Sequence, residues 1–324
     1  MRYILGNITL TIPAGAYRGK GMFIRQLTYL VALAQAQHFR RAAELCNVSQ
    51  PALSGAIRSI EEEFGLPIVR RGRRFEGFTP EGERVLAWAR QVLADCEGLR
   101  QEASSSRREV SGCLRIGAIP TALPLVPMLT DACLRDFPAM RHEVYTLSAA
   151  QALRQLGDLD LDVVLSYLDD PRLREFDTIP VFRERYVLIV RDEATLGGRD
   201  SLTWAEAAGF PLVLLTGNMQ CRQGVDDAFA NAGVVVSPRV ETDSLMALYA
   251  HVRCAGLCSV VPHSVLCLAE MRHELHAVPL TPAMHREIGL VLRDRQPRPP
   301  LLDAAMEAFR GIEIQSRVDA LLDL

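Results

Sequence analysis

The stretch from residue 39 to residue 58, FRRAAELCNVSQPALSGAIR, decides the fold of the first part of the chain. Small apolar residues early in the stretch predict a short helix, and Asn47 and Val48 predict a turn. Ser49 is a favourable N-cap for a second helix. Pro51 then falls in the first turn of that helix, where a missing N–H costs nothing. The pattern predicts two short helices joined by a tight turn.

The second helix has two faces of different chemistry. Apolar residues at helical spacing, in this helix and the one before it, are expected to pack on a preceding helix that contains residues 27–34. These positions are Ala42, Ala43, Leu45, Leu53, Ala56, Ile57, Ile60 and Phe64. The opposite face carries Gln50, Ser54 and Arg58, which are side chains of the kind that read base edges and phosphates in a major groove. The alternative is a solvated face on an ordinary helical hairpin.

A basic hairpin is predicted directly after this helix. Pro67 interrupts the helix, and Ile68 and Val69 favour a strand. The segment RRGRRFEGFTPEG, residues 70–82, then places four arginines around Gly72 before a new helix start. The arginines are Arg70, Arg71, Arg73 and Arg74. Such a hairpin can place cations along a phosphate backbone. The two elements together predict a winged helix-turn-helix that binds double-stranded DNA. The expected DNA-binding residues are these four arginines and Ser49, Gln50, Pro51, Ser54 and Arg58.

These segments resemble the LysR-type transcriptional regulators. The resemblance rests on AAELCNVSQPALSGAIRSIEEEFG (42–65), on residues 70–82 and on SGCLRIGAIPT (111–121), and it covers nearly everything from Met22 onward. The chain departs from the family at Ile68-Val69, where Leu-Phe is usual, and in residues 78–82, where Leu-Thr-x-Ala-Gly is usual. The resemblance implies a DNA-binding domain at 22–82, a linker and dimerisation helix with a hinge at 83–108, and an effector-binding domain at 109–324.

Residues 80–103 predict one long helix with an apolar seam. The seam residues alternate spacings of four and three, as in coiled coils. They are Val85, Ala89, Val92, Cys96, Leu99 and Ala103. A seam of this kind predicts a partner helix and therefore a homodimer with two recognition helices; the alternative is packing on its own chain. The resemblance adds that dimers assemble to a homotetramer and that RNA polymerase is a partner.

From Cys113 the pattern changes to short β-rich runs that alternate with helical stretches. Alternation of this sort predicts an α/β fold with mostly parallel sheets covered by helices. The resemblance implies two lobes like those of periplasmic binding proteins, joined by two crossing strands. Lobe one then takes residues 109–180 and 284–324, and lobe two takes residues 181–283. A small-molecule effector is expected between them.

The predicted effector site lies in loops that follow strands. Ligands of open α/β sheets bind at the carboxyl ends of strands, near helix N-termini. Hydroxyls, backbone N–H groups and an arginine suit a small carboxylate or other anion, although ordinary caps and turns are the alternative explanation. The positions are Thr121, Ser166, Tyr167, Thr216, Met219, Gln220, Arg222 and Thr242, of which Thr121 best matches the family's effector positions.

Cys221 supports an alternative hypothesis, a redox-gated regulator that senses oxidants. The segment GNMQCRQGVDDAF (217–229) resembles the region of peroxide-sensing family members in which a reactive cysteine precedes an arginine-containing helix. Arg222 and the helix N-terminus are expected to lower the pKa of the thiol. Those sensors carry a second cysteine nine positions later, where this chain has Ala230. Oxidation of a single thiol is then the simple chemistry available.

Composition narrows the class of protein further. A chain of 324 residues, 49% of them apolar, is long enough for about two domains. Residues 23–108 carry more basic than acidic groups and residues 109–324 the reverse, so the basic end is the expected DNA contact. No apolar run is long enough to span a bilayer and no export signal is recognisable, which predicts a cytoplasmic protein without membrane contact. Residues 1–21 lack a helical period and are expected to be a misannotated or disordered extension.

No catalytic motif is present in the sequence. A phosphate loop, a G-x-S-x-G elbow and an H-E-x-x-H helix are all missing, so the chain is not expected to be an enzyme or to hold a cofactor. His251, Cys254, Cys258 and His263 lie near one another, but HVRCAGLCSVVP is typical of a buried strand, so burial rather than metal binding is expected. A cleft-type solute-binding protein is a competing class, which the winged helix argues against.

Overall fold

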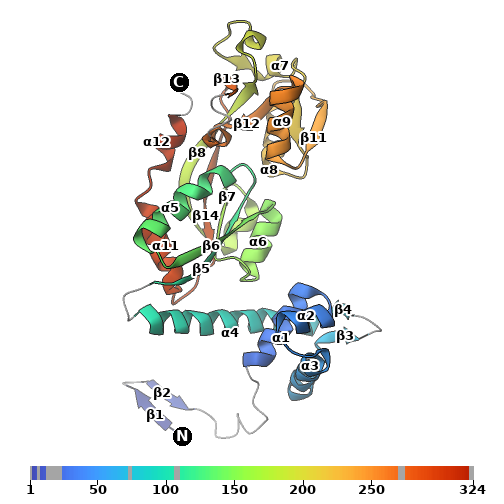
Figure 1. Ribbon diagram of the computed structural model, residues 1–324, viewed down its shortest axis with the longest axis vertical. Coiled ribbons are helices and arrows are strands. Elements are labelled where there is room, and N and C mark those ends of the chain that lie inside the picture. The colour runs from blue at the N-terminus through green and yellow to red at the C-terminus, as the bar shows by residue number, and fades with distance from the viewer. Residues whose placement is uncertain are drawn as a thin grey trace. The chain divides into compact units, whose positions relative to one another are not determined.

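The structure is a computed structural model that describes residues 2–5, 8–11, 24–71, 75–105, 110–268 and 274–320 (Figure 1). The chain divides into two compact units, Met1–Leu99 and Arg100–Leu324. Strands β1 (Arg2–Leu5) and β2 (Ile8–Thr11) form an antiparallel hairpin. The expectation for the rest of the first 21 residues lies outside the described part of the chain.

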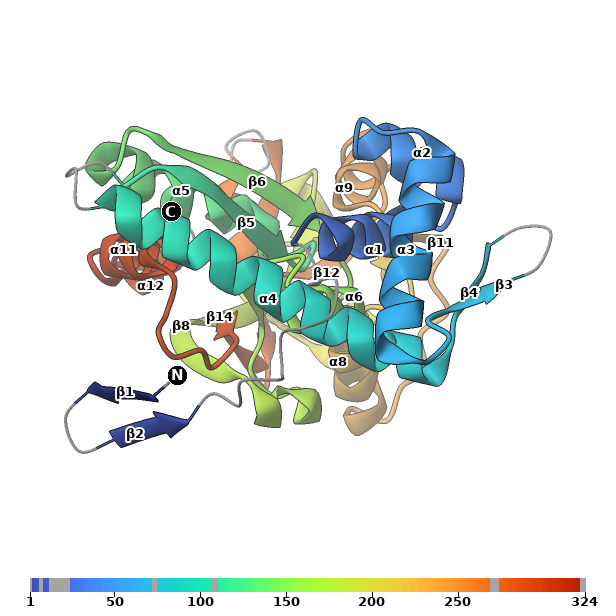
Figure 2. The same cartoon turned by 90° about the horizontal axis from the view of Figure 1, so that it is seen from below.

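Helices α1, α2 and α3 and a two-stranded hairpin gather at the N-terminal end of the long helix α4 (Figure 2). The elements are α1 (Ile24–Ala36), α2 (Phe39–Leu45), α3 (Gln50–Phe64), β3 (Val69–Arg71), β4 (Phe75–Phe78) and α4 (Pro80–Ser105). This order confirms the predicted winged helix-turn-helix and the predicted long helix after it.

The helix starts follow local capping signals. Ser49 Oγ accepts a hydrogen bond from the Ala52 N–H at 3.3 Å, as predicted. Thr79 Oγ1 accepts one from the Gly82 N–H at 2.9 Å, which fixes the start of α4. A Cβ atom at position 82 would overlap the backbone oxygen of Ile68, so glycine permits the close approach of α4 to the strand segment.

The first unit has its own apolar core. Leu53, Ile57 and Ile60 on α3 are fully buried, as predicted, and each contributes roughly 1.5–3 kcal/mol by leaving water. Two core predictions were wrong, since Leu45 is 62% exposed and Phe64 is 41% exposed. Each is the last residue of its helix. Their side chains lie beyond the apolar stripe because the chain turns away at that point.

The second unit contains an eight-stranded sheet that extends through two lobes. The strand order is β6-β5-β7-β14-β8-β13-β9, and β12 also pairs with β8. The strands are β5 (Gly112–Ala118), β6 (Met140–Thr146), β7 (Val163–Tyr167), β8 (Asp177–Val190), β9 (Leu202–Thr203), β12 (Ser259–Pro262), β13 (His276–Thr281) and β14 (His285–Leu292). A separate parallel pair is formed by β10 (Val213–Leu215) and β11 (Val240–Thr242).

The pairing is mixed rather than mostly parallel. Strand β5 pairs in parallel with β6 and β7, as expected for α/β alternation. Strands β12, β13 and β14 all pair antiparallel to β8. The difference arises because β8 runs through both lobes and pairs antiparallel with β14 in one lobe and with β12 and β13 in the other.

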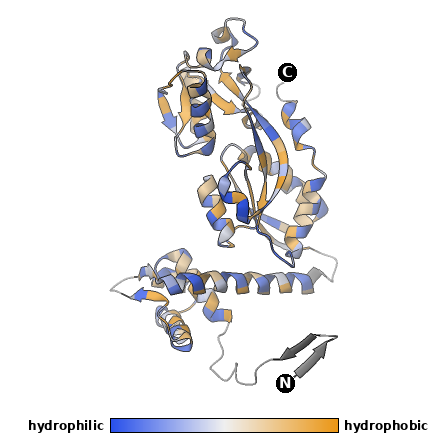
Figure 3. Ribbon diagram, turned by 180° about the vertical axis from the view of Figure 1, so that it is seen from behind, coloured by the Kyte–Doolittle hydropathy of each residue, from blue (hydrophilic) through white to orange (hydrophobic). Residues whose placement is uncertain are grey.

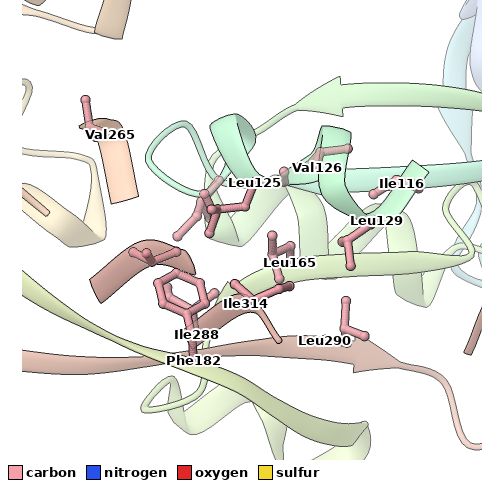
Figure 4. Packing of buried hydrophobic residues seen from close by; sticks show 14 of the residues in the cluster. Ile116, Leu125, Val126, Leu129, Leu165, Phe182, Val265, Ile288, Leu290 and Ile314 are labelled. Atoms are coloured by element: carbon pink, nitrogen blue, oxygen red, sulfur yellow. The ribbon is translucent and has the colours of Figure 1, made fainter. Parts of the chain in front are cut away.

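Helices cover the sheet and complete the core. They are α5 (Val126–Asp136), α6 (Ala149–Gly157), α7 (Trp204–Ala207), α8 (Gln220–Asn231), α9 (Leu245–Ala255), α11 (Pro300–Arg310) and α12 (Ile314–Asp319), with 3-10 turns η1 (Leu123–Leu125), η2 (Pro171–Glu175), η3 (Glu193–Leu196) and η4 (His263–Cys267). The central strands are largely hydrophobic, whereas the helices carry residues of both kinds (Figure 3). Figure 4 shows Leu125, Val126 and Leu129 packed near Leu165 and Ile288 of the sheet. Among the described residues, no helix has the length and apolar character needed to cross a bilayer.

Strand β8 belongs to both lobes. Its residues 177–185 pair with β14, and residues 186–190 pair with β12 and β13. The strand therefore passes from one lobe to the other between Arg185 and Tyr186. The residues at this crossing form the interior of the second unit's candidate site.

Candidate DNA-binding surface and thiol site

One exposed face of α3 carries the residues predicted to contact DNA. Gln50 and Arg58 are exposed and Ser54 is half-buried, and their spacing of four places them along one side of the helix. Ser49 and Pro51 are exposed at the start of the same helix. The arrangement offers amide, hydroxyl and guanidinium groups on a single helix face.

The wing adds positive charge beside this face. A surface hollow of about 660 Å³ is lined by Arg58 of α3 and Arg70 of β3, together with Glu61 and Glu62 of α3. Glu61 Oε1 accepts hydrogen bonds from the backbone N–H groups of Ile68 and Val69, at 2.9 and 3.0 Å. This carboxylate fixes the first wing strand against the recognition helix. The side chains of the three other predicted wing arginines, Arg71, Arg73 and Arg74, lie outside the described part of the chain.

Cys221 lies in the first turn of α8 and is only 7% exposed. Burial raises the pKa of this thiol to about 12, and the charge of Glu184 adds to the rise. A backbone N–H group at the helix start and the Arg286 guanidinium act in the opposite direction but are outweighed. The prediction of a lowered pKa was therefore wrong, because desolvation of the thiolate is the larger effect.

Arg222 has partners of its own. Its Nε donates to Asp226 Oδ1 at 2.8 Å, and its Nη1 donates to Glu241 Oε1 and to the Leu215 carbonyl, both at 2.6 Å. These bonds hold α8 against β10 and β11. The guanidinium is committed to the structure of lobe two, which leaves it poorly placed to bind an effector anion.

A chain of hydroxyl groups crosses the interior between the lobes. Thr121 Oγ1 lies 3.4 Å from the Tyr167 hydroxyl, which lies 3.0 Å from the Tyr186 hydroxyl. All three residues are at most 2% exposed. Ser264 Oγ donates to the Thr121 carbonyl at 3.3 Å. Two predicted effector residues, Thr121 and Tyr167, are thus brought together.

Glu184 lies in the same interior and is completely buried. Within the described part of the chain, neither carboxyl oxygen has a well-formed hydrogen bond, although the hydroxyls of Tyr167, Tyr186 and Ser264 are near enough to favour its ionised form. Burial outweighs them and raises the pKa of Glu184 to about 7. Burial, together with the Glu184 charge, raises the pKa of both tyrosines.

Arg286 on β14 connects this interior to α8. Its guanidinium lies over the Tyr167 ring and binds both carboxyl oxygens of Asp169, at 2.9 and 2.6 Å. It also donates to the Gln220 carbonyl at 3.0 Å, and the Gln220 amide donates to Asp170 Oδ2 at 2.8 Å. The first residue of α8, next to Cys221, is therefore held by two side chains from outside its own helix.

A small cavity of about 10 Å³ adjoins the thiol, close to the minimum for one water molecule. Cys221 and Tyr186 both line it, with apolar neighbours around them. The apolar lining comprises Leu214, Leu215, Val225, Val260 and Val261. The thiol thus faces a nearly filled pocket whose polar lining residues are Tyr186 and Arg222.

The other predicted effector positions are dispersed. Ser166 is buried on β7, and its Oγ has no partner among the described residues. Thr216 Oγ1 donates to Asn218 Oδ1 at 2.7 Å, and Thr242 Oγ1 accepts the Ser244 N–H at 3.1 Å, so both serve local turns. Met219 is half-buried as the N-cap of α8.

Glu184, Tyr186 and Arg286 were not predicted from the sequence. In the β8 segment FRERYVLIV, alternation places Glu184 on the same buried face as Phe182 and Tyr186, so a buried carboxyl group could have been predicted from the sequence. The sequence around Arg286 gives no sign that this residue belongs to the interior site. Its position follows from the pairing of Arg286 with Glu184 between β14 and β8.

Comparison with protein families agrees with this architecture. The model of the bacterial regulatory helix-turn-helix protein, lysR family, matches residues 24–83, and the model of the LysR substrate binding domain matches residues 107–312. This chain belongs to the LysR-type transcriptional regulators. As a LysR-type protein it is a DNA-binding transcription regulator and not an enzyme.

Several relatives within the LysR family are named for hydrogen peroxide. The chain is 32% identical to the "hydrogen peroxide-inducible genes activator" of Haemophilus influenzae, over 93% of this chain and 100% of that protein. It is also 32% identical to the "DNA-binding transcriptional dual regulator OxyR" of Escherichia coli, over 90% of this chain and 95% of that protein. Among solved structures, a full-length OxyR variant from Pseudomonas aeruginosa shares 27% identity with a TM-score of 0.73, and the match covers 92% of this chain and 98% of that one.

Proposed function

We propose that this LysR-type protein is a redox-gated transcription regulator whose action on DNA changes when a hydroperoxide oxidises Cys221. The single observation that carries the proposal is the position of the thiol in the first turn of α8, beside Gln220, which Arg286 and Asp170 hold from outside the helix. The relatives named for hydrogen peroxide support the same oxidant class.

Oxidation converts the Cys221 thiol and hydrogen peroxide to a sulfenic acid and water. The added oxygen enters a pocket with room for about one water molecule. Overfilling such a site costs about 1–3 kcal/mol, and the new polar group needs partners. The start of α8 therefore shifts, and the contacts of Gln220 with Arg286 and Asp170 change. For this to gate transcription, the oxidised thiol has to favour one arrangement of the domain over another.

The proposed switch forms no disulfide with the position nine residues after Cys221, where the peroxide-sensing members of the family carry their second cysteine. That position is Ala230 here, and it is exposed. A sulfenic acid at Cys221 is returned to the thiol by a small thiol reductant, so the change is reversible.

On the DNA side, we infer that Gln50, Ser54 and Arg58 read base edges, and that Arg70 and its neighbouring wing arginines contact phosphates. Two helices from a homodimer would then read two half-sites. The N-terminal half of α4 packs on its own domain, with Leu86 and Ala89 buried. Trp88 and Leu99 on the same helix are 72% and 71% exposed. These large apolar side chains suit a partner helix, in support of a homodimer. Pairing of dimers to a tetramer and action on RNA polymerase are part of the proposal from the family resemblance.

A small-molecule effector is the second candidate for the gating signal. It is favoured by the convergence of Thr121, Tyr167 and Arg286 on one interior. An anion there would face Glu184, and burying two like charges together is costly. The charge of Glu184 therefore favours an uncharged ligand over the small carboxylate expected from the sequence.

The deciding experiment uses the full-length protein bound to the promoter region beside its own gene. Hydrogen peroxide is expected to change the footprint of the wild type and of the control Cys254→Ser, whose cysteine is exposed, and to leave Cys221→Ser unchanged. Mass spectrometry after dimedone treatment should find the label at residue 221. A footprint insensitive to peroxide, with thermal stabilisation by one compound from a panel of small metabolites, would favour the effector hypothesis instead.

A further inference from the structure

We propose that Glu184 accepts the Cys221 proton, by way of the Tyr186 hydroxyl, when the thiol reacts with a hydroperoxide. The inference rests on the proposed redox function. The proton acceptor would then lie on β8, the strand that runs through both lobes, and not on α8, the helix that carries Cys221.

The need for a proton acceptor follows from the burial of the thiol. The thiolate is the form that attacks peroxides. Because burial raises the pKa of Cys221 to about 12, little of the thiol is ionised at neutral pH. A helix N-terminus and nearby cations, which activate exposed cysteines, are outweighed here. Oxidation at a useful rate therefore requires a base that takes the proton as the sulfur–oxygen bond forms.

Glu184 is placed to be that base. It is fully buried, and neither of its oxygens has a well-formed hydrogen bond within the described residues, so both can receive a proton. It lies two residues before Tyr186 on the buried face of β8. Tyr186 lines the same small cavity as Cys221, and its hydroxyl is one of the groups near enough to Glu184 to favour the ionised carboxyl group. Tyr186 is therefore the link that we propose between the thiol and the carboxyl group.

The groups around Glu184 come from five elements. Tyr167 lies on β7, Tyr186 on β8, Arg286 on β14, Ser264 on η4 and Cys221 on α8. Arg286 is a permanent cation that favours the ionised carboxyl group, and the three hydroxyls act in the same direction, while burial opposes them. The result is a pKa near 7, which leaves a large share of the carboxyl groups able to accept a proton in neutral solution.

The step balances in atoms and electrons. The sulfur electron pair forms a bond to one peroxide oxygen, the O–O bond breaks, and sulfur is oxidised by two electrons as the peroxide is reduced. The thiol proton passes to Tyr186, whose own proton passes to Glu184. The leaving hydroxide recovers a proton along the same route and departs as water. Glu184 and Tyr186 end in their starting states, and Cys221 ends as a sulfenic acid.

The test is the rate of Cys221 oxidation by hydrogen peroxide in the full-length protein, measured between about pH 5.5 and 8.5 by alkylation of the remaining thiol and mass spectrometry. The wild-type rate should rise through about pH 7 and then level off. Glu184→Gln keeps the shape of the side chain but cannot accept the proton, so its rate should fall about 100-fold or more and lose the inflection. Tyr186→Phe should also slow the reaction. The matched control Glu287→Gln removes an exposed carboxyl group on β14 and should behave as wild type.

The outcomes distinguish a failure of the proposed role of Glu184 from a failure of the proposed redox function of Cys221. If Glu184→Gln reacts at the wild-type rate with an unchanged pH profile, the inference is overturned and the redox function stands. If Cys221 of the wild type does not react with peroxide, the redox function itself is wrong. If Glu184→Gln does not fold, the pH dependence of the wild-type oxidation rate decides alone. A rate that keeps rising tenfold per pH unit to about pH 8.5 indicates reaction of the free thiolate and overturns the inference.

Discussion

The guanidinium carbon of Arg286 lies 3.5 Å from the centroid of the Tyr167 ring. A cation over an aromatic face contributes about 0.5–1 kcal/mol at exposed sites and about 2 kcal/mol when desolvated. The same guanidinium binds Asp169 and the Gln220 carbonyl. One side chain therefore joins β14, the loop after β7 and the first residue of α8. The shift of α8 that we propose on oxidation would alter the contact of Arg286 with the Gln220 carbonyl.

Glu184→Gln should stabilise the protein at pH 8 but have little effect at pH 5. The pKa of Glu184 is raised from 4.5 to about 7 by folding, so its contribution to stability is complete below about pH 4.5 and is lost as pH rises through 7. Above pH 7 the buried carboxylate costs on the order of 3 kcal/mol, a cost that the amide avoids. Denaturant unfolding at both pH values measures the difference. The exposed control Glu287→Gln should change stability by less than about 0.5 kcal/mol, and equal effects of Glu184→Gln at both pH values would contradict the prediction.

Gln50→Ala should weaken operator binding by about 1–3 kcal/mol, because a bidentate contact to a base is lost. Binding to random DNA should change little. Fluorescence anisotropy with both DNA sequences measures the ratio, and Glu63→Ala, at an exposed position of the same helix, serves as the control. Equal losses on operator and random DNA would show that Gln50 does not read bases.

Arg70→Ala should lower the affinity for every DNA sequence and flatten its salt dependence. Removing one phosphate contact reduces the slope of log affinity against log salt by about one. The control Arg84→Ala removes a cation on α4 whose side chain is 70% exposed and ion-paired with Glu81. A salt slope unchanged from wild type for Arg70→Ala would remove Arg70 from the interface.

Arg222→Ala should destabilise the second unit by about 2 kcal/mol. The side chain is 9% exposed and donates to Asp226, Glu241 and the Leu215 carbonyl. The two carboxylates are 46% and 50% exposed, so solvent screens them and keeps the loss moderate. Thermal unfolding measures the effect, with the exposed Arg174→Ala as the matched variant. A loss no larger than that of Arg174→Ala would mean that these bonds do not persist in solution.

Helices and strands whose signals lie within a few residues of one another could be predicted from the sequence. The N-cap of α3, its early proline and its apolar period all lie within a few residues, so the helix and its exposed face were readable. The interior site depends on distant pairings. Arg286 reaches Glu184 through the β8–β14 register, and Arg222 meets Glu241 from 19 positions away. Burial of Cys221 depends on residues distant in the sequence, such as Tyr186 and Val260, so the direction of its pKa shift could not be predicted from the local sequence.

Strand β8 carries the proposed proton acceptor and also holds the two lobes of the second unit together. Its 14 residues pair with strands of both lobes. Inserting or deleting one residue would turn Glu184 or Tyr186 to the opposite face and would displace the pairing of a whole lobe. Single side chains along β8 can therefore be exchanged without changing the register of either lobe, whereas the length of the strand is fixed by its pairing in both.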